Sequence, residues 1–388
     1  MKNIAIYLGN EPYPKQGGME RATDLLIKML SAHYNIIIIC KEKNRLGEIY
    51  ISPAPIYFLP SDSEKQRANL IDLLRSNQIH VLIDQCEGGV VGRYGIFRKR
   101  SDLLVDGIKL VAVQHSSPMA ALNNYCVLKR KQFKYLYMNI LYNVLLLYFL
   151  KQRAYWLQKS LATDLNKNYD KIVTLSPAFI THFYKLCSQK SKGKVVAIPN
   201  PNTYEESVER TVAEKSVLFV GRLDNRTKGV DRLLRIWSMV ESRCSDWGLQ
   251  IVGDGQDKQM LENLKEELQL KRVSFEGFRS PKSYYETASI LCMTSTFEGF
   301  GMVLTEAMQH GVVPMAFNSY DALQDIITPE KDGVVITAFD EKSYADRLLA
   351  LIEDQHTLRK MAVQAMLSST RFSRSNIIDK WCDLIDNL

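Results

Sequence analysis

Residues 295–311, STFEGFGMVLTEAMQHG, are the stretch that decides the fold. The apolar runs at 288–296 and 312–317 on either side of it each predict a buried strand. Between them Gly299 and Gly301 free the backbone, and the apolar positions that follow recur with helical spacing, so a helix is expected to begin near Gly301. The stretch therefore predicts a unit of strand, glycine turn, helix and strand.

The start of this helix predicts a site for a phosphate group. Free N–H groups and the helix dipole both attract an anion at such a position. Glu298 precedes the helix and Glu306 lies one to two turns inside it, and a carboxylate, which only accepts hydrogen bonds, can hold sugar hydroxyls. The pair favours a nucleotide-sugar over a bare nucleotide. The alternative is that Glu298 caps the helix and Glu306 is a solvated surface residue.

The composition is that of a soluble α/β protein. With 388 residues, of which 46% are hydrophobic, the chain is long enough for two domains with full cores. Its seven cysteines are odd in number and include no CxxC pair, which indicates reduced thiols and a cytoplasmic location. The apolar run before Gly9 is too short for a signal sequence and instead predicts a first buried strand.

Charge is divided unevenly along the chain. Residues 1–200 carry 28 lysines and arginines against 14 acidic residues, whereas residues 201–388 carry 22 against 29. The basic half indicates a surface that faces something anionic, such as a membrane, a lipid-phosphate acceptor or a nucleic acid. The alternative is simply a soluble basic surface.

Strands and helices alternate through both halves. Strands are expected at 4–8, 34–40, 56–59, 81–84, 110–114, 171–175 and 194–201, and then at 217–220, 249–252 and 273–275, with helices between them at 20–31, 63–77, 230–244 and 258–268. The Pro-Asn-Pro break at 199–201 and the polar run after it mark the best domain boundary. The chain is therefore expected to be α/β, with two doubly wound domains and a cleft between them.

Three residues of the first half are candidates for the site because of their position after strands. Gly17 and Gly18 stand between the first strand and its helix, where N–H groups could meet a phosphate, although a plain turn is the simpler interpretation. His115 follows the strand at 110–114, and ligands gather at the carboxyl ends of parallel strands. The alternative for His115 is a structural histidine with satisfied hydrogen bonds.

The segment at 129–159 is the least typical of the chain. Its apolar centre, 135–150, is shorter than a membrane-spanning helix and contains Asn139 and Asn143. Basic clusters at both ends, with Tyr and Trp between them, suit a helix that lies on an anionic membrane, at about 1 kcal/mol per basic residue near the surface. The alternative is a long core helix with basic flanks.

Two cations follow the first strand of the second half. Arg222 and Lys228 lie within GRLDNRTKG, where they could neutralise the charge that builds on a leaving diphosphate. No acidic cluster nearby offers a metal site, so these cations could take the place of a metal. The Gly-Asp-Gly of residues 253–255 lacks the final glycine of a dinucleotide fingerprint and is interpreted as a turn.

The tripeptide Glu-Gly-Phe occurs twice, at 276–278 and at 298–300, each time after an expected strand. A glycine followed by an aromatic ring could hold a nucleobase between the backbone and the ring, which makes Gly277 and Phe278 candidates. The repeat could equally arise by chance, because three residues carry little information.

Taken together, these motifs resemble the retaining glycosyltransferases of family 4, which have the two-domain GT-B fold. The resemblance rests on Gly17-Gly18-Met19-Glu20, His115, Val220-Gly221-Arg222-Leu223 with Lys228-Gly229, and the stretch from Glu298 to Glu306. It implies an acceptor-binding domain at 1–198, on which a C-terminal helix at 375–388 would pack, and a donor-binding domain at 199–374.

The resemblance also implies a role for each residue. Arg222 and Lys228 would bind the donor phosphates, with Gly221 beside them and Gly18 approaching from the other domain. Glu306 would hold the ribose hydroxyls. Glu298 and the N–H groups of Phe300, Gly301 and Met302, which follow Gly299, would hold the transferred sugar and the β-phosphate, and His115 would contact the sugar. One departure is Arg226, a third cation that could reach the phosphates or face water.

The resemblance predicts a metal-independent enzyme that needs no cofactor and keeps the α configuration of the sugar. Glu298, His115, Arg222 and Lys228 are the expected catalytic residues. The expected donor is a UDP-sugar carrying a hexose, and the acceptor is a glycan or lipid-linked saccharide at the inner face of the plasma membrane; no nucleic acid partner is expected. Two alternatives are a GT-B sugar-nucleotide epimerase and a non-catalytic nucleotide-sugar binding protein at the membrane.

Overall fold

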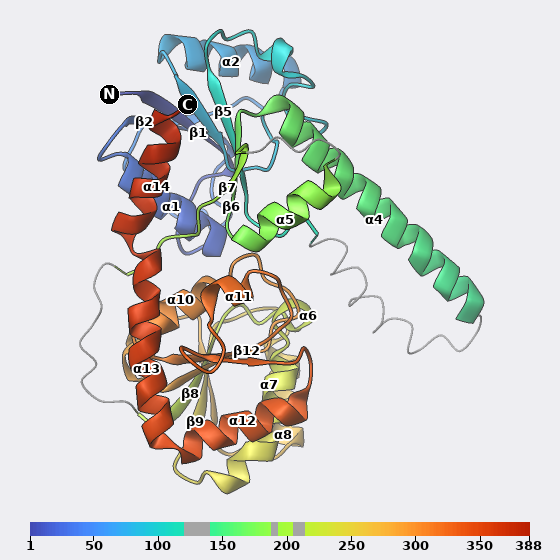
Figure 1. Ribbon diagram of the computed structural model, residues 1–388, viewed down its shortest axis with the longest axis vertical. Helices are drawn as coiled ribbons and strands as arrows, with labels where there is room; N and C mark the ends of the chain where they lie inside the picture. Colours follow the sequence, from blue (N-terminus) through green and yellow to red (C-terminus); the bar gives the residue numbers. More distant parts are fainter. Residues whose placement is uncertain (120–139, 188–192, 205–213) are drawn as a thin grey trace. The chain divides into compact units, whose positions relative to one another are not determined.

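The computed structural model describes residues 1–119, 140–187, 193–204 and 214–388 (Figure 1). The chain divides into two compact units, one formed by Met1–Thr203 with Arg374–Leu388 and the other by Tyr204–Ser373. The sequence places the corresponding boundaries at 198/199 and 374/375. Each unit is built around its own parallel sheet, so each is described separately.

The first unit contains a seven-stranded parallel sheet with the order β3-β2-β1-β4-β5-β6-β7. Its strands are β1 (Asn3–Asn10), β2 (Asn35–Glu42), β3 (Ile56–Phe58), β4 (Val81–Asp84), β5 (Lys109–Gln114), β6 (Lys171–Thr174) and β7 (Val195–Ala197). The central strands are buried along almost their whole length, as expected for runs of Val, Ile and Leu that are covered on both faces.

Helices cover both faces of this sheet. They are α1 (Gly18–Leu30), α2 (Ser63–Ser76), α4 (Ile140–Asn168), α5 (Pro177–Leu186) and α14 (Arg374–Asp386), with a 3-10 turn at Arg100–Leu103. α1 and α14 lie side by side on one face, where Leu26 and Trp381 pack against Ile6 (Figure 1). α2, α4 and α5 cover the other face, where Leu165 and Phe183 join the core.

The helix α4 differs from its prediction in extent. The sequence ends the segment at 159, whereas α4 continues to Asn168 because Ala162 and Leu165 enter the core of the sheet. Residues 129–139 of the predicted segment lie outside the described residues. Among the residues that the structure describes, no helix is both long and apolar enough to cross a bilayer.

The second unit contains a six-stranded parallel sheet with the order β10-β9-β8-β11-β12-β13. Its strands are β8 (Ser216–Val220), β9 (Gly248–Val252), β10 (Val273–Gly277), β11 (Ile290–Met293), β12 (Val313–Phe317) and β13 (Val334–Ile336). Its helices are α6 (Asn225–Lys228), α7 (Val230–Val240), α8 (Lys258–Glu267), α9 (Lys282–Thr287), α10 (Met302–Gln309), α11 (Leu323–Ile326), α12 (Glu341–Glu353) and α13 (Gln355–Ser369).

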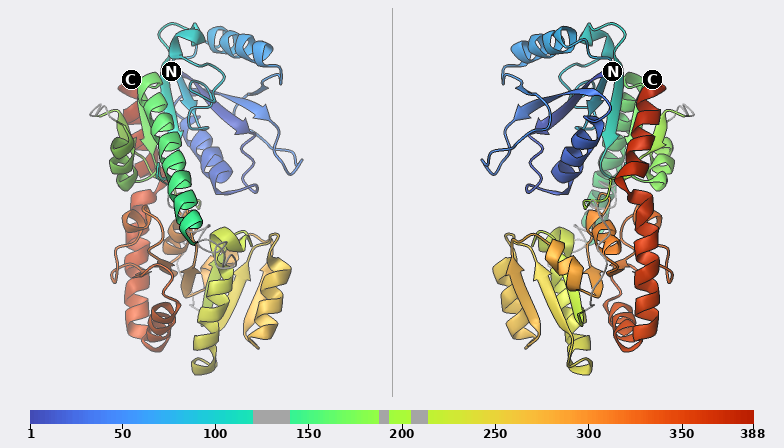
Figure 2. Two further views of the ribbon diagram at one scale, coloured as in Figure 1. Left: turned by 90° about the vertical axis from the view of Figure 1, so that its right-hand side faces the viewer. Right: turned by 90° about the vertical axis from the view of Figure 1, so that its left-hand side faces the viewer.

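The second sheet is also covered on both sides (Figure 2). α7, α8 and α12 form a core with one face through Trp237, Leu261 and Tyr344. α10 and α13 pack on each other and on β12 at the opposite face. The predicted unit of strand, glycine turn, helix and strand is therefore confirmed as β11, α10 and β12, and it occupies the middle of the sheet.

Candidate active site

The loops after β8, β9 and β10 are joined by backbone hydrogen bonds at the carboxyl end of the second sheet. Gly221 N–H donates to Val252 O at 3.0 Å, and Gly253 N–H donates to Gly277 O at 2.9 Å. Gly253 has a positive φ of 147°, and a Cβ at this position would lie 1.9 Å from Gly221 O. Residues 253–255 therefore form a close-packed loop, in agreement with their interpretation as a turn and not as a dinucleotide motif.

Lys228 and Glu298 meet at this edge of the sheet. Lys228 Nζ lies 2.6 Å from Glu298 Oε1, and the side chains are only 22% and 12% exposed. The hydroxyl of Ser295 donates to the same carboxylate oxygen at 2.6 Å. α10 has Gly301 as its N-cap and no side-chain cap, so the alternative that Glu298 caps the helix is wrong.

The sharp turn after Lys228 depends on Gly229. This residue has a φ of 61° and is the last residue before α7. A Cβ here would lie 2.1 Å from Arg232 Nη2 and 2.6 Å from Thr294 O. Arg232, which sequence reasoning missed, donates from Nη2 to Thr294 O at 2.9 Å and to Thr296 Oγ1 at 2.6 Å, and thus ties α7 to the end of β11.

The signal that could have found Arg232 is its place on the apolar face of its helix. It is 7% exposed and lies between Val230 and Leu233, both fully buried. A buried guanidinium needs several hydrogen-bond acceptors, and carbonyl groups at a strand end supply them.

Arg222 and Arg226 differ from Lys228 in that they face solvent. The side chain of Arg222 is 72% exposed, and its nearest acidic atom is Asp224 Oδ2 at 3.9 Å. Arg226 is exposed on α6. The edge of the sheet therefore presents two solvated cations beside a lysine whose charge is already matched by Glu298.

The start of α10 is held by aromatic residues. Phe300 and Met302 are buried, and the ring of Phe300 packs edge-on against Phe372 with centroids 5.8 Å apart. Gly301 has a φ of 89°, and a Cβ here would lie 2.5 Å from the hydroxyl of Tyr320. Burial raises the pKa of Tyr320, and the charge of Glu298 raises it further.

Glu306 is fully buried, so the alternative of a solvated surface residue is wrong. Its carboxylate accepts a hydrogen bond from the Tyr285 hydroxyl at 2.9 Å. His310, one turn later, stacks on Tyr285 with ring centroids 5.6 Å apart. The role of Glu306 toward ribose hydroxyls stays a prediction.

Gly277 and Phe278 lie at the carboxyl end of β10. Gly277 has a φ of 72°, and the side chain of Phe278 is 66% exposed. An exposed ring beside a glycine leaves room for a flat ligand, and the nucleobase contact stays a prediction. Gly299 precedes Phe300 in the loop before α10.

The candidates of the first unit lie at the carboxyl ends of its own strands. Gly17 is the N-cap of α1 and Gly18 is its first residue, with no side-chain cap at this end of the helix. The backbone N–H of His115 donates to Glu87 Oε1 at 2.9 Å, and its ring Nε2 lies 2.7 Å from Gln85 Oε1. The carbonyl oxygen of Gln85 accepts only, so this ring nitrogen carries a proton.

Burial changes the protonation of this pair. It lowers the pKa of His115 to about 4 and raises the pKa of Glu87 to about 7. The imidazole is therefore neutral near neutral pH. Gln85 and Glu87 were missed by sequence reasoning, although they follow β4 as His115 follows β5, and the same rule would have found them.

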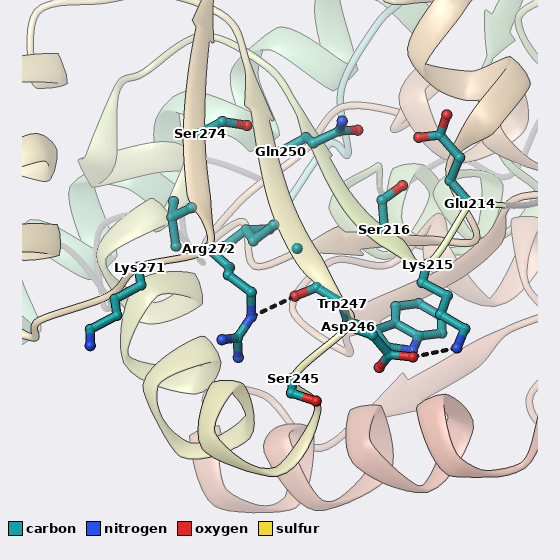
Figure 3. A pocket seen from close by; sticks show the side chains of 13 residues that line it. Glu214, Lys215, Ser216, Ser245, Asp246, Trp247, Gln250, Lys271, Arg272 and Ser274 are labelled. Atoms are coloured by element: carbon teal, nitrogen blue, oxygen red, sulfur yellow. Dashed lines mark hydrogen bonds and ion pairs between the residues drawn. The ribbon is translucent and has the colours of Figure 1, made fainter.

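A hollow of about 510 Å³ lies at the opposite, amino end of the second sheet (Figure 3). It is lined by Glu214, Lys215, Ser216, Ser245, Asp246, Trp247, Gly248, Leu249, Gln250, Lys271, Arg272, Val273 and Ser274. None of the predicted site residues is among them. Figure 3 shows an ion pair of Lys215 with Asp246 and a hydrogen bond from Arg272 to Trp247 O among these residues.

Within the described ranges, no three His, Cys, Asp or Glu side chains gather closely enough to hold a metal ion. The six cysteines of these ranges are unpaired.

Residues 202–366 match the family described as glycosyl transferases group 1. The second domain belongs to this family. The matched range includes Lys228, Glu298 and Glu306, whose roles stay predictions. The resemblance proposed from the sequence is thereby confirmed, whereas membership of family 4 stays a prediction.

The chain is similar to several curated bacterial proteins. It is 32% identical over 216 residues, 55% of this chain and 60% of the relative, to an uncharacterized glycosyltransferase of Haemophilus influenzae. It is 30% identical over 47% of this chain and 50% of the relative to an α-1,4-N-acetyl-D-galactosaminyltransferase of Campylobacter jejuni that acts on a saccharide linked to undecaprenol. The matches thus span about half of the length of these relatives.

Solved structures share the fold over the whole chain. The lipopolysaccharide outer core galactosyltransferase WaaB matches 100% of both chains with a TM-score of 0.71 and 17% identity. WaaG, described as a glycosyltransferase involved in lipopolysaccharide biosynthesis, matches 98% of this chain and 99% of its own with a TM-score of 0.68 and 16% identity. The predicted GT-B fold with two Rossmann-like domains is confirmed.

Proposed function

We propose that this protein is a retaining, metal-independent glycosyltransferase of cell-surface polysaccharide biosynthesis. It transfers a hexose-type sugar from a UDP-sugar to a glycan or lipid-linked acceptor. The observation that carries the proposal is the Lys228–Glu298 contact of 2.6 Å at the carboxyl end of the second sheet, within a domain of the glycosyl transferases group 1 family.

The chemistry assigned to this edge is the departure of a nucleoside diphosphate. The bond between the anomeric carbon and the phosphate oxygen breaks, and the acceptor oxygen forms the new bond on the same face of the sugar. The acceptor proton passes to the leaving phosphate, so UDP and the glycoside are the products. Lys228 and Arg222 stabilise the charge that grows on the diphosphate, where fixed cations act most strongly.

Glu298 and His115 are assigned to the transferred sugar. The carboxylate accepts hydrogen bonds from sugar hydroxyls on one side while Lys228 holds it in place. His115 is neutral, so its unprotonated ring nitrogen accepts a hydrogen bond without adding charge near the anomeric carbon. The α10 N-terminus receives the β-phosphate.

The choice of UDP is supported by the described contents of neighbouring structures. Anabaena HepE, with a TM-score of 0.70 and 16% identity, is described in complex with UDP-glucose. TarM of Staphylococcus aureus, with a TM-score of 0.61 over 83% of this chain, is described with UDP. We extend this donor class to the present protein.

A membrane-borne acceptor is supported by the exposed face of α4. Tyr148 and Trp156 are eight residues apart, as are Phe149 and Leu157, so each pair lies on the same side of the helix, and all four residues are exposed. Arg153 lies on the same side as Phe149 and is exposed. Aromatic rings between basic residues suit the headgroup layer of an anionic bilayer, and we place the protein on the cytoplasmic face.

The proposed activity is tested by incubating the protein with radiolabelled UDP-sugars and membranes from its own organism. We expect label to enter the lipid fraction with the α configuration, and we expect the rate to survive EDTA. Loss of the rate that only a divalent ion restores would overturn the metal-independent mechanism.

The two alternative functions give different results in the same experiment. An epimerase converts the donor when no acceptor is present, whereas a transferase releases at most slow hydrolysis products. A non-catalytic protein binds UDP and leaves the donor unchanged. Either outcome would replace the proposed function.

The membrane proposal is tested by flotation with vesicles that contain anionic lipid. Binding should weaken with salt, because basic residues near the surface contribute about 1 kcal/mol each and are screened. Trp156→Ala should weaken it further, whereas Met239→Ala, a control at another exposed apolar residue, should not. Binding that ignores both salt and Trp156 would contradict the assignment of α4.

A further inference from the structure

The first unit contains a hollow that no residue of the predicted site lines. Its volume is about 370 Å³, within the range of small-molecule sites, which begins near 300 Å³. It is lined by Lys41 at the end of β2, by Cys86, Glu87, Gly88, Gly89, Val91, Gly92, Arg93 and Tyr94 after β4, and by Leu161, Asp164 and Leu165 of α4. The hollow therefore lies at the carboxyl ends of two strands, where α/β sheets bind ligands.

The loop that forms most of this hollow is held in one conformation. The buried carboxylate of Asp84 accepts hydrogen bonds from Cys86 N–H at 2.8 Å and from Val90 N–H at 2.9 Å. The hydroxyl of Tyr169 donates to the same carboxylate and accepts from Val91 N–H at 3.1 Å. The hollow is thus preformed, so a ligand does not have to order the loop when it binds.

Gly89 lets the loop that lines the hollow pack closely on the sheet. A Cβ at Gly89 would lie 2.6 Å from Cys86 Cβ and 3.0 Å from the Tyr7 ring. Gly89 therefore lets this loop pack directly on Cys86 and Tyr7, which helps to hold the wall of the hollow in place.

The side chains around the hollow combine three kinds of group. Glu87 and Asp164 supply carboxylates, and Lys41 and Arg93 supply cations on exposed side chains. The ring of Tyr94 is 74% exposed, with the Arg93 guanidinium 5.8 Å from its centroid. A purely anionic ligand would be repelled by the carboxylates, and an apolar one would leave the charges unpaired.

A saccharide satisfies all three kinds of group. Its hydroxyls donate to carboxylates and accept from lysine and arginine, and the C–H face of its ring packs on an exposed aromatic side chain. This combination distinguishes the hollow from that at the amino end of the second sheet, whose aromatic residue, Trp247, is 3% exposed.

Two connections relate the hollow to the proposed reaction. Glu87 lines the hollow and also accepts the hydrogen bond from the backbone N–H of His115 at 2.9 Å. α4 carries the exposed Trp156 and Leu157 and, one turn later, Leu161 in the wall of the hollow. The lipid and the sugar part of a lipid-linked glycan would therefore both lie next to α4.

We propose that this hollow is the acceptor subsite and that it binds the glycan part of a lipid-linked saccharide, with Arg93 and Tyr94 as the residues that select it. The proposal rests on the proposed function, because it names the second substrate of that reaction. Neither residue belongs to the donor-binding machinery.

The test compares variants at the rim of the hollow in the transfer assay with membranes. Arg93→Ala and Tyr94→Ala should each raise the membrane concentration that gives half of the maximal rate about tenfold or more, the first through the loss of a charged hydrogen bond and the second through the loss of the ring that packs on the sugar. Tyr94→Phe keeps the ring and should remain close to the wild type. Arg75→Ala, at an exposed arginine of α2, is the matched control.

Two further measurements separate the acceptor from the donor and the glycan from its lipid. The affinity for UDP, measured by calorimetry, should stay within twofold in every variant. Saccharides released from the same membranes by mild acid should compete with transfer by the wild type and should compete less well with transfer by Arg93→Ala.

Each outcome decides the proposal. Rim variants that transfer sugar as the wild type does would overturn the acceptor subsite and leave the proposed function intact. A parallel loss of UDP affinity would overturn it by assigning the residues to the donor or to folding, and released saccharides that do not compete would show that the lipid alone is recognised. A wild type that transfers no sugar removes both proposals.

Discussion

The two ends of the second sheet differ in how far their charged side chains are exposed to water. The amino end has the hollow of about 510 Å³ and an ion pair, Lys215–Asp246, whose side chains are 56% and 55% exposed. The carboxyl end has the Lys228–Glu298 pair, with side chains only 22% and 12% exposed. Exposed charges are screened by water, whereas partly buried ones act in a lower dielectric, so the carboxyl end is the stronger electrostatic environment.

The difference follows from the direction of parallel strands. Each strand leads through a loop into the N-terminus of the next helix, so N–H groups and glycines collect at the carboxyl end. The tight packing of Gly253 on Gly221 and the positive φ of Gly229 and Gly301 all occur at this end. The amino end receives the opposite ends of the helices, where carbonyl groups and not N–H groups are left free.

The largest expected effect is the loss of activity when Lys228 is removed. Lys228→Ala should lower turnover about 100-fold to 1,000-fold, the usual effect of removing one donor that stabilises transition-state charge. The same substitution at the amino end, Lys215→Ala, should leave turnover unchanged. Both are measured in the transfer assay, with folding checked by circular dichroism. Equal effects at the two ends would contradict the contrast between them.

A second comparison uses a glycine from each end. Gly229→Ala should lower the free energy of unfolding by roughly 2–4 kcal/mol, because φ is 61° and the new Cβ would clash with Arg232 and Thr294 O. Gly248→Ala at the amino end should change it by less than about 0.5 kcal/mol, since the nearest atom to its Cβ would be Arg272 O at 3.7 Å. Denaturant titration measures both. A stable Gly229→Ala variant would show that this turn tolerates a side chain.

A third prediction concerns buried titratable groups at the carboxyl end of the first sheet and the pH dependence of stability that they cause. Burial raises the pKa of Glu87 from 4.5 to about 7, so between these pH values the folded state binds the proton and the unfolded state does not. The contribution of Glu87 to stability therefore falls as pH rises through this range. His115 acts in the opposite direction, because its pKa is lowered from 6.5 to about 4 and stability falls as pH decreases through that range.

Glu87→Gln isolates the first effect. Relative to the wild type, the variant should gain about 1–3 kcal/mol between pH 4.5 and pH 7, at 1.4 kcal/mol per pKa unit and with allowance for partial exposure. The measurement is urea unfolding at a series of pH values. A difference between variant and wild type that does not change with pH would place the carboxylate of Glu87 in water.

The smallest expected effect is at the exposed ion pair. A double-mutant cycle of Lys215→Ala and Asp246→Ala should give a coupling of about 0.2–1 kcal/mol that decreases with added salt. A coupling of several kcal/mol would mean that the amino-end hollow is as dry as the active edge, and the contrast between the two ends would no longer hold.

Local sequence patterns predicted most of the fold. Runs such as 36–39 and 81–83 are continuous in Ile, Leu and Val, and the structure places them in β2 and β4, two interior strands of the first sheet. The helix after Gly301 begins at Met302, as its glycine and apolar spacing indicated. The extension of α4 to Asn168 was missed, because polar residues from 158 onward concealed two buried positions at Ala162 and Leu165.

The candidate site was predicted less completely. Lys228 and Glu298 were chosen from the sequence, but their direct contact depends on two loops that are seventy positions apart in the chain. Glu306 was given two roles from the sequence, and its burial against Tyr285 excludes one of them. Arg232 was not chosen, because its partners are remote in the chain, whereas Gln85 and Glu87 follow β4 and the rule that selected His115 would have found them.

The sequence by itself determined which segments become strands and helices, where glycines turn the chain, and that a glycosyltransferase domain is present. These properties depend on periodicity and on short motifs, which act over a few residues. The tertiary structure decided which charged side chains are shielded from water, which carboxylates are paired, and where hollows form. Burial and the local dielectric depend on everything that packs around a side chain. That is why Lys228 and Lys215, one residue type in one domain, have different expected roles.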